Sequence, residues 1–288
     1  MNIFGDLWLA AGDWWTTRRL RFCVSQRYWS IVCLHESPPD TLLRATLERA
    51  AEHYQFVSLE QGLQHLQRGD FKRPLLTITY DDADRSVYDY ALAVHADLKI
   101  PACVYVCTGY IREGLRHLTH GSPRPTMTWQ ELSEWTAAGL DVGGHTVNHI
   151  PLAQATSGRA RWEITASMQA IEDKLGIPVR HFAYPWGIYT DELADWVDKE
   201  SPLESMATTV SADNYPPQRG KHLYRRSLMP SAICGINWAR RFPEDSFVQT
   251  FRRHFYRRIL RSQAPVVFRE FHAADTGKSC VSEQREDI

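Results

Sequence analysis

Short apolar runs alternate with helical patterns along most of the chain. We expect strands over residues 27–34, 74–80, 101–107, 139–144, 178–184 and 204–210, with 222–228 or 264–271 as an addition. Between them, apolar residues recur at three- and four-residue steps, which is typical of helices that bury one face. Strands that alternate with helices at this spacing favour a parallel sheet.

Capping residues mark the ends of the expected helices. One helix is expected within 84–98, where apolar residues share a face. Thr128 and Glu131 have the spacing of a capping box, so a second helix begins there and stops before Gly139. A third apolar stripe ends at Gly176, which is a typical C-terminal capping residue.

Length and charge limit the classes of protein that fit. With 288 residues, 43% of them hydrophobic, the chain is long enough for one α/β barrel. The 33 Lys and Arg residues balance 34 Asp and Glu residues, so no overall field favours nucleic acid. We expect one α/β barrel domain of about seven parallel strands over 27–275, after an N-terminal extension over 1–26 and before a polar tail over 276–288.

Cysteine usage and the N-terminus bear on location. Six cysteines are scattered without the paired spacing of a disulfide framework or a zinc ribbon, which predicts buried free thiols in a reducing compartment. The first apolar run is broken by Asp6 and Asp13 and lacks a basic start, so it makes a poor signal peptide and is too short to span a bilayer. These features favour a cytoplasmic location.

Two adjacent carboxylates, Asp81 and Asp82, end the expected strand at 74–80. The carboxyl ends of parallel strands are where α/β proteins place their functional loops. A single aspartate there is commonly a helix cap. Two like charges at a half-buried strand end repel each other unless a cation or a proton intervenes, so the pair indicates a cation site.

His145 and His149 follow the expected strand at 139–144, one helical turn apart. Such a pair also occurs by chance or in a core. Its place after a strand, however, brings it to the carboxyl-terminal opening of the barrel, here called the mouth, where the aspartates also lie. Two imidazoles and one carboxylate with an open position are the ligand set of catalytic zinc, which lowers the pKa of a bound water. The second carboxylate is then free to accept a proton.

The stretch FAYPWGIYT, over 182–190, also follows a strand. Pro185 and Gly187 on either side of Trp186 predict a tight turn. A backbone N–H in such a turn can point into the mouth as an oxyanion donor. An ordinary turn with an aromatic plug explains the stretch equally well.

In combination, TYDDA, HTVNH and AYPWG resemble the polysaccharide deacetylases of carbohydrate esterase family 4, in their FAYP-type subgroup. The resemblance extends from about residue 29 to about 210 and implies a distorted (β/α) barrel. It implies Asp81 as the general base. It also implies Asp82, His145 and His149 as ligands of a divalent metal, most simply Zn²⁺, and the Trp186 N–H as part of the oxyanion hole.

The family also uses a histidine as proton donor, commonly late in the chain. His222, His254 and His272 match this position weakly. Circularly permuted members carry the acid near the N-terminus, and the resemblance therefore implies His35, which ends the strand in SIVCLHES. A hydrogen-bonded histidine at a strand end is the alternative interpretation.

Two positions depart from the family pattern. Ala83 stands where the family usually has Gly, and a positive φ there costs alanine about 1 kcal/mol. Ala183 stands where many members have an Arg that orients the base, a loss shared with the FAYP-type branch. Arg225 and Arg226 are both candidates for the missing cation.

The resemblance implies a metal-dependent hydrolase that releases acetate from an N-acetylated amino sugar in a polysaccharide, oligosaccharide or glycolipid. Alternatives are a hydrolase of another linear or cyclic amide, such as a formamide or ureide, and a glycan-binding barrel without turnover. A non-haem iron oxygenase shares the ligand set, but its jelly roll is all-β, unlike the pattern here.

Residues 245–262 have phenylalanines and an isoleucine on one side and arginines around the rest. A basic amphipathic helix can lie on an anionic membrane, which suits a lipid-linked glycan. Such a helix can equally pack its apolar side on its own domain.

Overall fold

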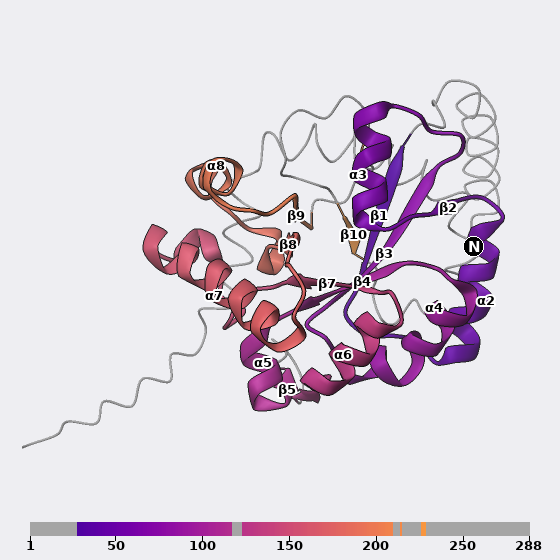
Figure 1. Ribbon diagram of the computed structural model, residues 1–288, viewed down its shortest axis with the longest axis horizontal. Helices are drawn as coiled ribbons and strands as arrows, with labels where there is room; N and C mark the ends of the chain where they lie inside the picture. The colour runs from indigo at the N-terminus through magenta and orange to yellow at the C-terminus, as the bar shows by residue number, and fades with distance from the viewer. Residues whose placement is uncertain (1–27, 117–122, 210–213, 215–225, 229–288) are drawn as a thin grey trace, which may run out of the picture. The chain divides into compact units, whose positions relative to one another are not determined.

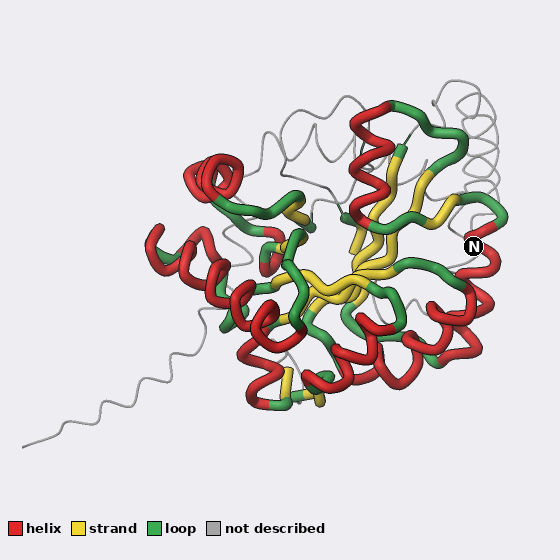
Figure 2. The backbone as a smooth tube through the Cα atoms, viewed as in Figure 1, coloured by secondary structure: helices red, strands yellow, loops and turns green. Residues whose placement is uncertain are grey.

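The computed structural model describes residues 28–116, 123–209, 214 and 226–228. All of them belong to 1–244, the first of the two compact units into which the chain divides. Within this part, a curled sheet is surrounded by helices and connected by short loops (Figures 1 and 2).

The described strands form a parallel sheet in the order β10–β1–β3–β4–β7–β8–β9, and β2 pairs with the start of β3. Their bounds are β1 Trp29–Leu34, β2 Gln55–Phe56, β3 Leu75–Asp81, β4 Ala102–Val106, β7 Asp141–Gly144, β8 His181–Ala183, β9 Ser205–Ala207 and β10 Ser227–Leu228. Since β10 and β9 are its two edges among the described strands, the sheet is a half-barrel. The sheet is parallel, as the alternating pattern predicts, and its curl gives the distorted (β/α) barrel that the resemblance implies.

Helices connect these strands. They are α2 (Asp40–Ala51), α3 (Leu59–Arg68), α4 (Leu92–Leu98), α5 (Thr108–Glu113), α6 (Trp129–Ala137), α7 (Ser157–Leu175) and α8 (Asp191–Glu200). A two-stranded antiparallel ribbon, β5 (Leu115–Arg116) with β6 (Arg124–Pro125), lies between α5 and α6.

The expected helix boundaries are largely confirmed. Thr128 and Glu131 form the predicted capping box at the start of α6, and α7 ends at Gly176, whose φ of 68° is easy for glycine. The helix expected within 84–98 is correct only in part. A π-helix over Val87–Ala91 precedes the regular turns of α4.

Alternation along the strands divides the core between two faces. On β3, Leu76, Ile78 and Tyr80 belong to a large outer core, whereas Leu75 packs in a smaller inner core with residues of β1, β4 and α3. In Figure 1, α3 lies on one side of β1 and β3, and α2, α4 and α6 lie on the other side. The same period places Thr79 and Asp81 on the inner face, so the last residue of β3 faces the inside of the half-barrel.

Three of the six cysteines lie in the described residues, and all three, Cys33, Cys103 and Cys107, are buried and free. The prediction of buried free thiols is confirmed for them. Cys23, Cys234 and Cys280 lie outside the described residues.

Several expected segments also lie outside the described residues: the extension 1–26, the alternative strand 264–271, the basic helix 245–262 and the tail 276–288. None of the described helices combines the length and the apolar character that crossing a bilayer requires.

Candidate active site

Asp81 is buried on the inner face and receives three donors. Arg226, itself fully buried, donates from Nη1 to Oδ1 at 2.6 Å and from Nη2 to Oδ2 at 2.9 Å. The thiol of Cys33 donates to Oδ2 at 3.2 Å. Arg226 is therefore the cation in the site that lacks an arginine at Ala183, whereas Arg225 lies outside the described residues.

This pairing decides the protonation state of Asp81. Burial alone raises the pKa of Asp81, but the charge and hydrogen bonds of Arg226, together with the nearby His145, outweigh burial and hold this pKa well below its ordinary value. Asp81 is thus an ionised carboxylate at neutral pH, in a place where water is largely excluded.

Asp82 points in a different direction because the backbone turns at this residue. Its φ is 68° and that of Ala83 is 52°, so both residues adopt the left-handed region directly after the strand. Asp82 Oδ1 lies 3.6 Å from His145 Nε2 and 3.4 Å from His149 Nε2. The positive φ considered for Ala83 is therefore present.

His145 is fixed in one tautomer. Its Nδ1 lies 2.7 Å from the carbonyl oxygen of Ala183, which can only accept, so Nδ1 carries the proton and Nε2 presents a lone pair to Asp82. Burial is the main cause that lowers the pKa values of His145 and His149 to about 4. Both imidazoles are therefore neutral at pH 7, as metal ligands must be.

The two histidines face a common point, as their spacing suggests, but a loop and not a helix brings them together. Residues 145–149 are irregular, with positive φ at Thr146 (70°) and His149 (49°), and Thr146 Oγ1 accepts from the His149 N–H at 2.9 Å. These two residues turn the chain back, which brings both rings to the same point.

Glu163 of α7 holds this loop, although sequence reasoning missed it. Its fully buried carboxylate accepts from the N–H groups of Val147 and Asn148, each at 2.9 Å, and from the Asn148 side chain at 2.8 Å. Arg159 balances its charge at 2.6 Å. The sequence signal that could have identified Glu163 is its position on the apolar side of the helix, next to Ile164.

Asp82, His145 and His149 fit a divalent metal. Their ligand atoms all lie within 4.8 Å of one another, and Asp82 Oδ1 is buried without a hydrogen-bond partner. Three lone pairs that face each other repel unless a cation lies between them. Ligands about 2.1 Å from a tetrahedral ion lie roughly 3.4 Å apart, close to the distances here.

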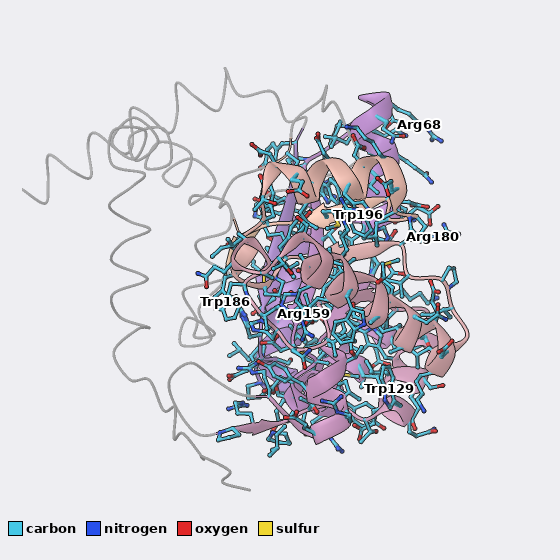
Figure 3. All side chains as sticks on the ribbon, turned by 90° about the vertical axis from the view of Figure 1, so that its left-hand side faces the viewer. Arg68, Trp129, Arg159, Arg180, Trp186 and Trp196 are labelled. Carbon is cyan, nitrogen blue, oxygen red and sulfur yellow. The ribbon has the colours of Figure 1, made fainter. Side chains whose placement is uncertain are left out.

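Trp186 lies beside the candidate metal site and at the surface (Figure 3), with 40% of its area exposed. Its ring meets His149 edge-on at 4.4 Å between centroids, and Tyr110 stacks on the same imidazole at 5.6 Å. The φ of Trp186 is 52°, and its carbonyl accepts from Thr209 Oγ1 at 2.8 Å. Among the described residues, the Trp186 N–H has no hydrogen-bond partner.

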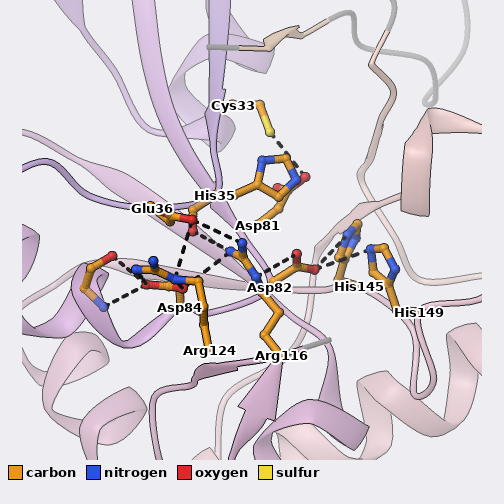
Figure 4. A network of polar contacts seen from close by, with 11 residues as sticks. Cys33, His35, Glu36, Asp81, Asp82, Asp84, Arg116, Arg124, His145 and His149 are labelled. Atoms are coloured by element: carbon orange, nitrogen blue, oxygen red, sulfur yellow. Dashed lines mark hydrogen bonds and ion pairs between the residues drawn. The ribbon is translucent and has the colours of Figure 1, made fainter. Parts of the chain in front are cut away.

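His35 follows β1 and its ring lies next to the Asp81 carboxylate (Figure 4). His35 is close enough to contribute to lowering the pKa of Asp81, after Arg226 and His145, which act against burial. The late candidates His222, His254 and His272 lie outside the described residues.

A second polar cluster, which the sequence analysis missed, adjoins Asp82. Arg116 and Arg124 surround Asp84, with Arg124 Nε 2.8 Å and Arg116 Nη1 3.5 Å from Asp84 Oδ2. Glu36 completes it, 3.4 Å from Arg116. The Asp84 carboxylate also accepts a hydrogen bond from the Ser86 N–H. This contact is an Asx turn, and the D-x-S spacing is its signal in the sequence. No local signal marks Arg116.

Comparison with known proteins shows similarity to polysaccharide deacetylases. The profile described as polysaccharide deacetylase matches residues 68–200. The poly-β-1,6-N-acetyl-D-glucosamine N-deacetylase of Staphylococcus epidermidis is 25% identical over 179 residues, which are 57% of this chain and 60% of that protein. The protein of the same name from Staphylococcus aureus strain MSSA476 is 22% identical over 174 residues, 56% of this chain and 58% of that protein.

Solved structures share the fold. The deacetylase PplD from Streptococcus pyogenes superposes with a TM-score of 0.62 at 19% identity, covering 78% of this chain and 99% of that one. IcaB from Ammonifex degensii gives 0.59 at 23% identity, covering 74% and 97%. Residues 68–200, just under half of the chain, thus match the polysaccharide deacetylase profile, and the chain is similar to the two staphylococcal deacetylases over about three fifths of their length.

Proposed function

We propose that the chain is a metal-dependent N-deacetylase that hydrolyses the acetamide of an amino sugar and releases acetate. The observation that carries this proposal is the convergence of Asp82, His145 and His149 around an unpartnered carboxylate oxygen, beside the ionised Asp81. The family and its relatives named as poly-β-1,6-N-acetyl-D-glucosamine deacetylases support the reaction class and a polymeric amino-sugar substrate.

Asp82, His145 and His149 would hold the metal, and zinc suits two neutral imidazoles and one carboxylate at this spacing. A divalent ion bound there would polarise the acetyl carbonyl and lower the pKa of a bound water. Asp81 takes the proton from the attacking water, since it is ionised and does not itself face the two imidazoles as Asp82 does.

The Trp186 N–H stabilises the oxyanion that develops on the carbonyl. It is unpaired among the described residues, and the bond from Thr209 to the Trp186 carbonyl fixes the turn at that residue. The exposed indole offers a flat face on which a sugar ring can stack.

His35 donates a proton to the leaving amine. Its ring is next to Asp81 in Figure 4, and it directly follows β1, the strand that neighbours β3 in the sheet. A protonated imidazole beside the base can pass its proton to the nitrogen as the C–N bond breaks.

Acetate release tests this function. Chelator-stripped protein is assayed on poly-β-1,6-N-acetylglucosamine, chitooligosaccharides and N-formylated analogues, with zinc added back. We expect zinc-dependent acetate release, lost in Asp81→Asn and lowered about 10²-fold or more in His35→Ala. His35→Ala leaves the buried Asp81–Arg226 pair intact and thus guards against loss of folding.

The outcomes separate the alternatives. Formate released in preference to acetate would assign another amide as the substrate. Zinc binding without turnover on any N-acylated sugar would favour a glycan-binding barrel. Oxygen consumption with Fe²⁺ would point to an oxygenase and contradict the proposal.

A further inference from the structure

Arg116 lies buried between the ends of two neighbouring strands of the site, although it belongs to neither. It comes from β5, and its side chain is 4% exposed. Nη1 donates to the backbone carbonyl of His35 at 3.1 Å, and Nε lies 3.8 Å from Asp82 Oδ2. Figure 4 shows the guanidinium between the His35–Glu36 backbone and the carboxylates of Asp82 and Asp84.

The sheet itself does not hold His35 and Asp82 in place. The ladder between β1 and β3 ends at the pair Leu34–Tyr80, one residue before His35 and two before Asp82. Beyond that pair β1 has ended, while β3 continues for one residue, Asp81, which pairs with Tyr105 of β4. Asp82 then turns away with a φ of 68°. A group that contacts both residues therefore fixes what the ladder leaves free.

Arg116 has the chemistry for this role. A guanidinium presents several N–H donors in a rigid plane, so it can contact a carbonyl on one side and a carboxylate on another. Asp82 directs Oδ1 to the two imidazoles while Oδ2 faces Arg116. An oriented carboxylate binds a metal better than one that rotates freely.

Burial excludes direct contact with a sugar. Arg116 is 3% exposed, and its Nε atom is buried without a hydrogen-bond partner among the described residues. A substrate therefore meets Trp186 at the surface, whereas Arg116 acts through the residues it touches.

Resting on the function proposed above, we propose that Arg116 is a positioning residue that fixes His35, the proton donor, relative to Asp82, the metal ligand. It does so by holding the His35 carbonyl and the Asp82 carboxylate with one side chain. The proposal predicts that Arg116 affects both zinc affinity and kcat, but not the binding of the sugar.

Arg124 provides a matched control. It is an arginine of the same cluster and contacts Asp84 and Glu36, but none of its hydrogen bonds or ion pairs among the described residues reaches His35 or Asp82. A variant at Arg124 therefore perturbs the charge and packing of the cluster without touching the two site residues.

The experiment compares Arg116→Met with Arg124→Met. Zinc dissociation constants come from competition with a chromophoric chelator, and kcat and KM from acetate release at saturating zinc. We expect Arg116→Met to raise the zinc Kd and lower kcat by about 10-fold or more each, with KM within about 3-fold. Arg124→Met should change each quantity by less than about 3-fold.

Equal zinc Kd and kcat values in the two variants would show a merely structural cluster and overturn the proposal. If Arg116→Met does not fold, Arg116→Lys replaces it, because one ammonium cannot contact both residues in the way a guanidinium does. The same directions of change are expected.

The link to His35 is tested in a double-mutant cycle. At saturating zinc, Arg116→Met should lower kcat about 10-fold in the native background and less than about 3-fold when His35 is already Ala. Equal losses in both backgrounds would contradict the link. If the unmutated chain releases no acetate, the proposed function fails, while the zinc Kd of the two arginine variants still tests the contact with Asp82.

Discussion

Asp81 and Asp82 are adjacent in sequence but differ in environment, since the backbone turns between them. Asp81 ends a regular strand and faces the inner side of the sheet, where Arg226 and Cys33 donate to it. Asp82 begins a left-handed turn and faces two neutral imidazoles. One residue of backbone geometry therefore separates the proposed proton acceptor from the proposed metal ligand.

Arg226→Met tests the partner of Asp81. The substitution leaves a buried carboxylate without its cation, which we expect to cost about 3–5 kcal/mol of unfolding free energy and to raise the pKa of Asp81. Urea denaturation measures the loss. The double variant Arg226→Met/Asp81→Asn should recover part of it, and a loss below about 1 kcal/mol in the single variant would show that the pair is unimportant.

The sequence predicted the residues of the site better than their partners. The motifs placed Asp81, Asp82, His145 and His149 at one mouth, and the absence of an arginine at Ala183 indicated that another cation was needed. Arg226 could not be distinguished from Arg225 because 145 residues separate it from Asp81. Only the pairing of β10 with β1 decides which of them reaches the inner face.

At the scale of elements, the loop 145–149 is shaped by a helix far along the chain. Glu163 of α7 accepts two backbone N–H groups of this loop, and Gly109 leaves room for it, since a Cβ there would lie 2.3 Å from the Val147 carbonyl oxygen. The spacing of His145 and His149 did not reveal the geometry of this loop, because positive φ values at Thr146 and His149 have no sequence signal in residues other than glycine.

Glu163→Ala should loosen this loop. It leaves the Val147 and Asn148 N–H groups without an acceptor, at about 1–3 kcal/mol each, and should weaken zinc binding about 10-fold or more. Glu172→Ala is the control, because Glu172 accepts from the Val179 N–H near the other end of the same helix. Identical zinc affinity in both variants would show that Glu163 does not shape the site.

At the scale of the whole molecule, periodicity predicted a parallel sheet, and the strands appear near the expected places. It did not predict the curl of the sheet, the ribbon β5–β6 or the π-helix over Val87–Ala91, which depend on tertiary contacts. The proposed division into an extension over 1–26, a barrel domain over 27–275 and a tail over 276–288 stays a prediction.

Buried neutral histidines should make the fold sensitive to acid. Burial lowers the pKa of His95 to about 4, so the unfolded chain binds its proton between pH 6.5 and 4 while the folded chain does not. This stability is complete above pH 6.5 and is lost as the pH falls towards 4. His95 alone accounts for a loss on the order of 3 kcal/mol.

His95→Gln isolates this effect. In chelator-treated protein, the free energy of unfolding measured by urea should fall less steeply between pH 6.5 and 4 in the variant than in the native chain. His95 lies in the outer core, bonded to the Tyr80 hydroxyl and the Ile100 carbonyl, so the metal site is unchanged. An unaltered slope would show that His95 titrates alike in both states.

The most direct test of the account is anomalous diffraction at the zinc edge from a crystal of the zinc-loaded chain. We expect one strong peak about 2.0–2.2 Å from Nε2 of both His145 and His149 and from a carboxylate oxygen of Asp82, with Asp81 outside the coordination sphere. A peak elsewhere, or no peak with Asp82 hydrogen-bonded away from the imidazoles, would contradict the account.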